Sequence, residues 1–263
     1  MKRKLTFTFI IWTVLLITYV PVIAIIAYSF GLGGYAGSES EFTFRMFTQL
    51  FQSEGMRRAI INTLIIGVVS SILAVLIGTF AAIGINNMRR FSRGGLMGIN
   101  QIPLTNPAII TSLSVMFFFS PSGFGLIEPG MTRVILAHAV IALPFVVLLV
   151  LPRLRSLDKN LLEAAQDLGS RPTNALFSVV IPQLFPAMVG AFLLGFTLSM
   201  DDFILAEFNR GASVETVATY VFGNMSRGIP QYFFAFGTII FVIVMLVVVM
   251  INFKLSKASK KVN

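Results

Sequence analysis

The chain has 263 residues, of which 56% are hydrophobic and 12% are charged, and its mean hydropathy is +0.86. A soluble domain carries about 25% charged residues, so this composition excludes a soluble protein and indicates an integral membrane protein. The absence of cysteine excludes disulfides and thiol chemistry. The formal net charge of +9 could suggest a nucleic-acid partner, but the placement of the basic residues indicates membrane topology instead.

Six segments have the roughly 20 mostly apolar residues that are needed to cross a bilayer. In chain order they cover roughly 7–30, 60–85, 101–120, 132–151, 187–206 and 233–253. The first follows a basic stretch that resembles the start of a signal peptide, but its apolar run exceeds the roughly 7–15 residues of a signal sequence, so we interpret it as an uncleaved anchor. The sequence therefore predicts an all-α integral membrane protein with six transmembrane helices.

Basic residues gather on one side of these spans. The two termini and the loops around 86–100 and 152–186 hold 14 basic and three acidic residues, whereas the opposite side holds six basic and eight acidic residues. Loops rich in Lys and Arg stay in the cytoplasm. We therefore expect a multi-pass protein of the cell membrane with both termini in the cytoplasm, surrounded by lipid and without a nucleic-acid partner.

The connections between the spans differ in character. Residues 31–58 begin with glycines and serines and continue with "FTFRMF", which predicts a flexible turn followed by a short surface helix. Pro103 and Pro107 remove two backbone donors at the start of the third span, so we expect an irregular turn that is buried by protein or lies beside a cavity. Small residues recur at helical spacing in the second and fifth spans, which predicts close helix packing, within this chain or against another subunit.

The loop after the fourth span predicts a compact helical hairpin. Asp158 can cap a helix over 159–168, and Gly169 is suited to end it in a left-handed conformation. A second short helix can run to about Val180, because Pro182 disfavours helical geometry in the residue before it. The first helix carries an apolar stripe of Leu161, Leu162, Ala165 and Leu168. Such a hairpin can rest on lipid headgroups or dock in a groove of a cytoplasmic partner.

This loop resembles a known motif. Glu163, Ala164 and Ala165 are followed after three residues by Gly169 and after nine more by "VVIP", ending at Pro182. The pattern is similar to the EAA loop of binding-protein-dependent ABC importer permeases, with Val179 and Ile181 in place of the Ile and Leu of the family. The resemblance implies that this loop is a coupling helix, which contacts an ATP-hydrolysing subunit through Glu163, Ala164, Ala165, Leu168, Gly169 and Pro182.

The same resemblance extends to the topology, because six spans with this loop between the fourth and the fifth fit the family. It implies a type I ABC importer permease fold in a single transmembrane domain over 1–263, with an N-terminal helix over 7–30, core helices over about 60–253 and the EAA loop over 152–186. The partners it implies are a second permease subunit, two ATP-binding subunits and an extracytoplasmic substrate-binding protein.

Carboxylates at the end of the fifth span are the candidate substrate contacts. The stretch "GFTLSMDDFILAEF" resembles the second permease subunit of spermidine/putrescine importers, which implies polyamines as the substrate. Carboxylates near membrane depth are costly unless they face water or a partner, and aromatic faces bind amines. We therefore predict that Asp201, Asp202, Phe196 and Phe203 contact substrate; alternatively, Asp201 and Asp202 only cap the fifth helix.

The remaining chemistry is sparse. The chain has no GxxxxGK[ST] phosphate loop, so we expect no cofactor and no catalysis in this chain, with ATP bound by the partner subunit. A single histidine, His138, cannot form a paired-histidine metal site, and we interpret it as a hydrogen-bonded packing residue. Other substrates for the same fold, such as ferric iron or phosphonate, stay open, and a secondary carrier is a further alternative.

Overall fold

The computed structural model describes residues 2–32, 41–125, 127–158, 160–225, 228 and 230–259. All regular secondary structure in these residues is helical, which confirms the predicted all-α class. The chain forms two compact units, one of residues 1–57 with 221–263 and one of residues 58–220. The predicted glycine-rich turn over 33–40 and the basic end of the tail lie outside the described residues.

The first unit pairs the two ends of the chain. Helix α1 (Lys2–Ser29) packs against α12 (Tyr232–Ser259), with the rings of Tyr28 and Phe234 5.5 Å apart. The predicted surface helix is α2 (Arg45–Gln52), which buries Met46 and Leu50, one turn apart, and also packs on α12. The spacing of these two apolar residues is that of one helix face, which is why this short segment folds against the unit.

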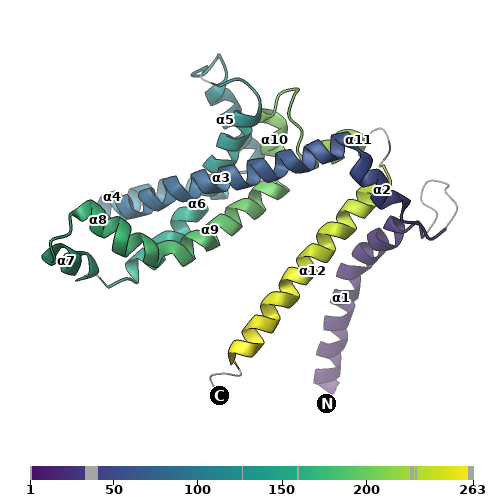
Figure 1. Cartoon of the computed structure of the whole chain (residues 1–263), viewed down its shortest axis with the longest axis horizontal. Helices are drawn as coiled ribbons and strands as arrows, with labels where there is room; N and C mark the ends of the chain where they lie inside the picture. The colour runs from purple at the N-terminus through teal and green to yellow at the C-terminus, as the bar shows by residue number, and fades with distance from the viewer. Residues whose placement is uncertain are drawn as a thin grey trace. The chain divides into compact units, whose positions relative to one another are not determined.

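The second unit is built on three long helices, seen in Figure 1 as the elongated bundle of blue, teal and green ribbons. They are α3 (Glu54–Asn87), whose first residues belong to the other unit, α6 (Met131–Arg155) and α9 (Ile181–Asp201). Small residues bring them together: a Cβ on Gly195 would lie 3.2 Å from Ser71 Oγ and 3.5 Å from Ala142 Cβ. The small-residue ridges of α3 and α9 therefore pack inside this chain.

The third predicted span contains the irregular turn that its prolines predict, and this turn is a sharp bend. Helices α4 (Arg90–Thr105) and α5 (Ala108–Phe119) meet at an angle of 107°. Pro107 disfavours helical geometry in the residue before it, and Asn106 is accordingly extended, with ψ of 141°. The break comes at Pro107, whereas Pro103 stays within α4. Asn100 Nδ2 donates to Pro144 O at 3.3 Å, which ties α4 to α6.

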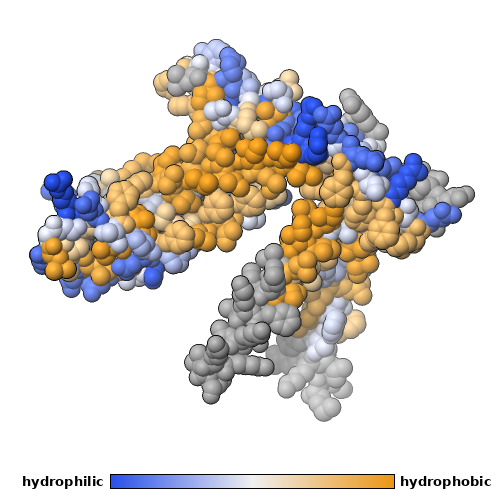
Figure 2. Space-filling view, viewed as in Figure 1, coloured by the Kyte–Doolittle hydropathy of each residue, from blue (hydrophilic) through white to orange (hydrophobic). Residues whose placement is uncertain are grey.

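By length and composition, four helices can cross a membrane: α1, α3, α6 and the continuous helix over 172–201. The bent α4–α5 pair adds a fifth if it forms one span. Helix α12 covers the sixth predicted segment. Its described part over Tyr232–Leu246 is an apolar helix that is shorter than the four spans. Apolar side chains cover the visible flank of α3 and α9, where a bilayer would contact the bundle (Figure 2).

The predicted second short helix of the hairpin does not end at Val180. Helix α8 (Pro172–Ala175) passes through a π-helical turn (Leu176–Val180) directly into α9. The π-turn shifts the hydrogen-bond register, so that Ile181 N donates to Leu176 O. Such single π-turns occur inside α-helices, and Pro182 follows directly after this one, within the continuous helix. The hairpin therefore has one short arm, α7 (Asn160–Asp167), and one long arm.

Candidate functional site

The turn between the two arms has the geometry that its glycine predicts. Asp158 Oδ1 accepts from Asn160 N at 3.0 Å, which caps the start of α7. At the other end, Gly169 N donates to Gln166 O at 2.8 Å and Ser170 N to Ala165 O at 3.1 Å. These two bonds form a Schellman motif. Gly169 has φ of +84°, a left-handed conformation that favours glycine.

The tip of the hairpin presents an apolar side chain to solvent. Leu168 is 89% exposed, and Ala164 on α7 is exposed as well, whereas Leu161 is half-buried. Glu163 lies in α7, but its side chain is outside the described residues, as is that of Leu162. Pro182 sits on the long arm and is exposed. Leu168 and Ala164 are therefore the exposed apolar side chains at the tip of the hairpin.

At the opposite end of the unit, the two neighbouring aspartates have different environments. Asp202 lies between α9 and α10 (Ile204–Asn209), and its Oδ1 accepts from Leu205 N at 2.6 Å in the first turn of α10. Partial burial raises the pKa of Asp202, while the hydrogen bond from Leu205 opposes that shift. Asp201 is exposed and makes no hydrogen bond or ion pair with the described residues. Asp202 is therefore a capping residue, and Asp201 is the available carboxylate.

The other members of the predicted cluster also have partners. Phe196 packs on α3, because a Cβ on Gly67 would lie 2.9 Å from its ring. Phe203 directly precedes α10 and is half-buried. Glu207 accepts from Arg210 Nε at 2.9 Å and from its Nη2 at 3.2 Å. These hydrogen bonds raise the pKa of Arg210.

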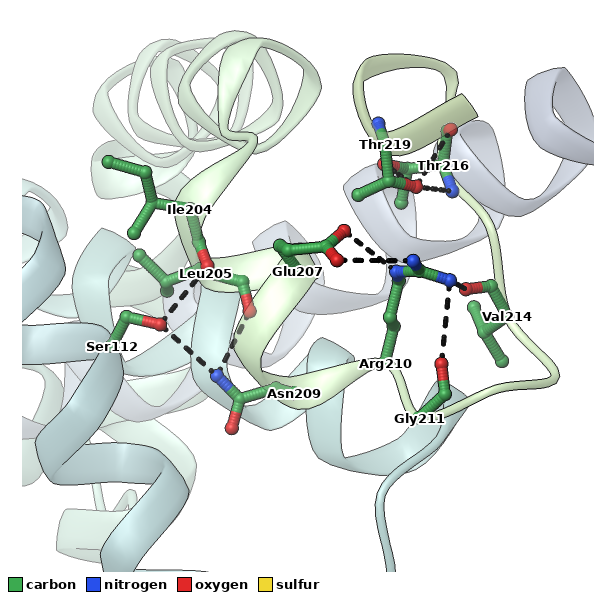
Figure 3. A network of polar contacts seen from close by, with 10 residues as sticks. All are labelled: Ser112, Ile204, Leu205, Glu207, Asn209, Arg210, Gly211, Val214, Thr216 and Thr219. Carbon is green, nitrogen blue, oxygen red and sulfur yellow. Dashed lines mark hydrogen bonds and ion pairs between the residues drawn. The ribbon is translucent and has the colours of Figure 1, made fainter. Parts of the chain in front are cut away.

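A network of polar contacts fixes the segment that follows Asp202 (Figure 3). Asn209 Nδ2 donates to Leu205 O at 2.9 Å, and Ser112 Oγ on α5 donates to Ile204 O at 3.2 Å. Further along, Thr216 N donates to Thr219 Oγ1 at 2.9 Å, which caps the start of α11 (Val217–Met225). The segment beside Asp201 and Asp202 is therefore held by defined side-chain contacts.

The sequence alone did not predict that Arg133 belongs to this network. Arg133 in the first turn of α6 is 2% exposed, and its Nε donates to Asn209 Oδ1 at 3.1 Å. Its Nη2 donates to Met116 O, a carbonyl in the last turn of α5. A cation at a helix C-terminus is favourable, so Arg133 joins the ends of three helices. A lone arginine at the start of an apolar span was the available signal.

His138 lies in α6 and is buried, with its Nδ1 2.8 Å from Ser199 Oγ on α9. Its Nε2 has no partner among the described residues. The prediction that His138 is a hydrogen-bonded packing residue is confirmed for one nitrogen. Within the described part of the chain, no group of three or more metal-binding side chains occurs.

The sequence of this bundle, which has an exposed turn at one end and carboxylates at the other, matches the model of a known protein family. The model of the binding-protein-dependent transport system inner membrane component matches residues 74–260, which is more than half of the chain. The chain belongs to this family. The residues that we predicted for the EAA loop lie within the matched region.

Two relatives indicate the branch of the family. The spermidine/putrescine transport system permease protein PotC of Haemophilus influenzae is 29% identical over 93% of this chain and 93% of its own length. The putrescine transport system permease protein PotI of Escherichia coli K12 is 30% identical over 84% of this chain and 80% of its own length.

Solved structures show the same fold. A bacterial ABC transporter for import of the acidic polysaccharide alginate contains a chain with a TM-score of 0.66 and 20% identity, covering 97% of this chain and 96% of that chain. An amino acid ABC transporter with histidines gives 0.56 at 17% identity, over 81% of this chain and 98% of that chain. These likenesses establish the ABC importer permease fold and carry no information on substrate.

Proposed function

We propose that the chain is a polyamine-transporting permease subunit of an ATP-driven importer, in the cell membrane. The observation that carries this proposal is the similarity to PotC and PotI over most of the chain. Spermidine and putrescine are polycations, and the proposed contact for an amine is the exposed carboxylate of Asp201. Phe203 follows within two residues and offers an aromatic face for cation–π contact.

The hairpin is the proposed docking site for the ATP-hydrolysing subunit. Leu168 and Ala164 are the exposed apolar side chains of its short arm, and Gly169 holds the turn in one conformation. Helix-in-groove docking uses such an apolar face on a short helix. The excess of basic residues at both termini and around the hairpin supports a cytoplasmic location for all three.

The proposed complex contains four further subunits. A second permease subunit would supply the other half of the translocation path, and two ATP-binding subunits would dock on the two hairpins. A substrate-binding protein would deliver the polyamine from the extracytoplasmic side. This chain contains no phosphate-binding loop in its sequence, and we therefore assign ATP binding and hydrolysis to the partner.

Reconstitution tests the proposal directly. The tagged chain is purified with the subunits that copurify, placed in proteoliposomes and supplied with ATP, the binding protein and labelled spermidine or putrescine. We expect uptake that requires both ATP and the ATP-binding subunit. Uptake by the chain alone under an ion gradient would indicate a secondary carrier, and uptake of ferric iron or phosphonate without polyamine uptake would indicate another substrate.

A further inference from the structure

A cavity of about 580 Å³ lies beneath α7, at the end of the three-helix bundle. The last turns of α3 and α6 and the start of α4 form its polar side, and the π-helical turn forms an apolar wall. The side chains that matter for its chemistry are Asn86, Asn87, Arg93, Arg155, Leu154 and Leu176. We infer that this cavity binds the headgroup of an anionic phospholipid.

The position of the cavity fits the membrane boundary. Helices α3 and α6 are two of the four helices that are long and apolar enough to cross a bilayer. They end at Asn87 and Arg155, which both line the cavity. The ends of spanning helices lie at the level of lipid headgroups. Figure 2 shows hydrophilic side chains at this end of the bundle, directly beside the apolar flank of α3 and α9.

Arg93 supplies a fixed positive charge. Its Nε donates to Ile85 O at 3.2 Å, and its Nη2 donates to Asn86 O at 2.6 Å and to Met88 O at 2.9 Å. An arginine has five N–H donors, and these contacts leave the two donors of Nη1 without a partner among the described residues. The guanidinium is held in place by the end of α3 and still has donors for a phosphate oxygen.

Arg155 supplies the second cation. It is exposed, and its side chain makes no hydrogen bond or ion pair with the described part of the chain. The one acidic side chain among the described lining residues is Asp158, and its Oδ1 already accepts from Asn160 N. Arg89 and Arg90 are exposed nearby in sequence and add to the positive potential. A phosphodiester is the complementary charge.

The apolar wall of the cavity favours a phospholipid over a free anion as the ligand. Inorganic phosphate would use the arginines and leave Leu154 and Leu176 without a partner. The glycerol and first methylene groups of a phospholipid would cover these side chains while the phosphate contacts the arginines. Basic pockets between spanning helices at the membrane surface bind acidic headgroups in this way. A polyamine, which is cationic, would be repelled.

Lipid retention in native mass spectrometry tests the assignment. The full chain, with the subunits that copurify, is titrated in detergent with phosphatidylglycerol and separately with phosphatidylcholine. Arg155→Gln should weaken phosphatidylglycerol retention on the order of fivefold, the contribution of one arginine near an acidic surface. Arg155→Lys should retain most of the binding. The matched control is Arg153→Gln, because Arg153 is equally exposed on the same helix but does not line the cavity.

Four outcomes would overturn the inference. These are equal retention of phosphatidylglycerol by wild type and Arg155→Gln, equal loss in Arg153→Gln, equal binding of phosphatidylcholine, and displacement of the lipid by millimolar inorganic phosphate. Loss of a copurifying subunit in Arg155→Gln with unchanged lipid retention would instead assign the cavity to a protein contact. The readout is a lipid adduct, so failure of the transport proposal leaves this test unaffected.

Discussion

His138 Nδ1 in α6 lies 2.8 Å from Ser199 Oγ in α9. These two helices are consecutive spans, and the hairpin that carries Gly169 is the connection between them. The pair is buried, near the end of the bundle that is opposite the hairpin. It therefore links α6 to α9 near the ends of both helices that are far from their connection.

Ser199→Ala should destabilise the bundle. The change leaves both nitrogens of a buried imidazole without a partner, which costs about 1–3 kcal/mol. The measurement is the midpoint of thermal unfolding of the purified chain in detergent. The control is Thr197→Ala on the same helix, because Thr197 is exposed and its hydroxyl bonds only to the backbone of Leu193. Equal midpoints for both variants would contradict the importance of the His138 contact.

Gly169→Val should uncouple the permease from the ATP-hydrolysing subunit. A β-branched residue at φ of +84° is strained by about 1–3 kcal/mol, so the turn would adopt another conformation. We expect normal insertion and assembly, reduced uptake and loss of substrate-stimulated ATP hydrolysis. The measurement compares both activities in the reconstituted complex.

The matched variant is Gly169→Asn. Asparagine tolerates the left-handed conformation better than other residues with a side chain, and no atom lies within 4 Å of the Cβ position. Gly169→Asn should therefore retain most of the coupling. If Asn and Val impair it equally, the backbone conformation at this position is not the cause.

Asp201→Asn and Asp202→Asn should differ in their effects on uptake. Asp201 is exposed and has no partner in the described structure, so its neutralisation should raise the KM for spermidine several-fold without changing stability. Asp202 caps α10, and asparagine is an equally good capping residue. The measurement is the initial rate of spermidine uptake. An unchanged KM for Asp201→Asn would remove it as a substrate contact.

Arg133→Met should destabilise the end of the bundle that holds α10. The change removes the donors to Asn209 Oδ1 and Met116 O and leaves one buried and one partly buried acceptor unsatisfied, and the buried one alone costs about 1–3 kcal/mol. The double variant with Asn209→Ala tests the pair. Residues in one hydrogen-bond network are coupled by about 0.5–3 kcal/mol, so additive changes in unfolding free energy would show that Arg133 acts through another contact.

The sequence predicts features that depend on neighbours along the chain. The apolar lengths of α1, α3, α6 and the helix over 172–201, the cap at Asp158 and the left-handed turn at Gly169 are all local, and the structure has them. The 107° bend at Pro107 is local as well, but two prolines offered two places for it, and the sequence does not distinguish them. The π-turn before Pro182 was missed because it is a small change in hydrogen-bond register.

Contacts between distant residues could not be predicted in the same way. Asp201 and Asp202 are indistinguishable by composition, and only the position of α10 makes one a cap and leaves the other exposed. Arg133 meets Asn209 across 76 positions of sequence, and no periodic pattern connects them. The roles of the substrate-path residues and of the hairpin residues stay predictions.

The helix over 172–201 is uninterrupted and, at 1.5 Å per residue, about 45 Å long. It begins three residues after Gly169 and ends at Asp201. A displacement of the turn by a neighbouring protein would therefore pass through two linking residues into one helix that ends at the exposed carboxylate of Asp201. A stiff rod of this length would let mechanical work at one end of the helix move the other end.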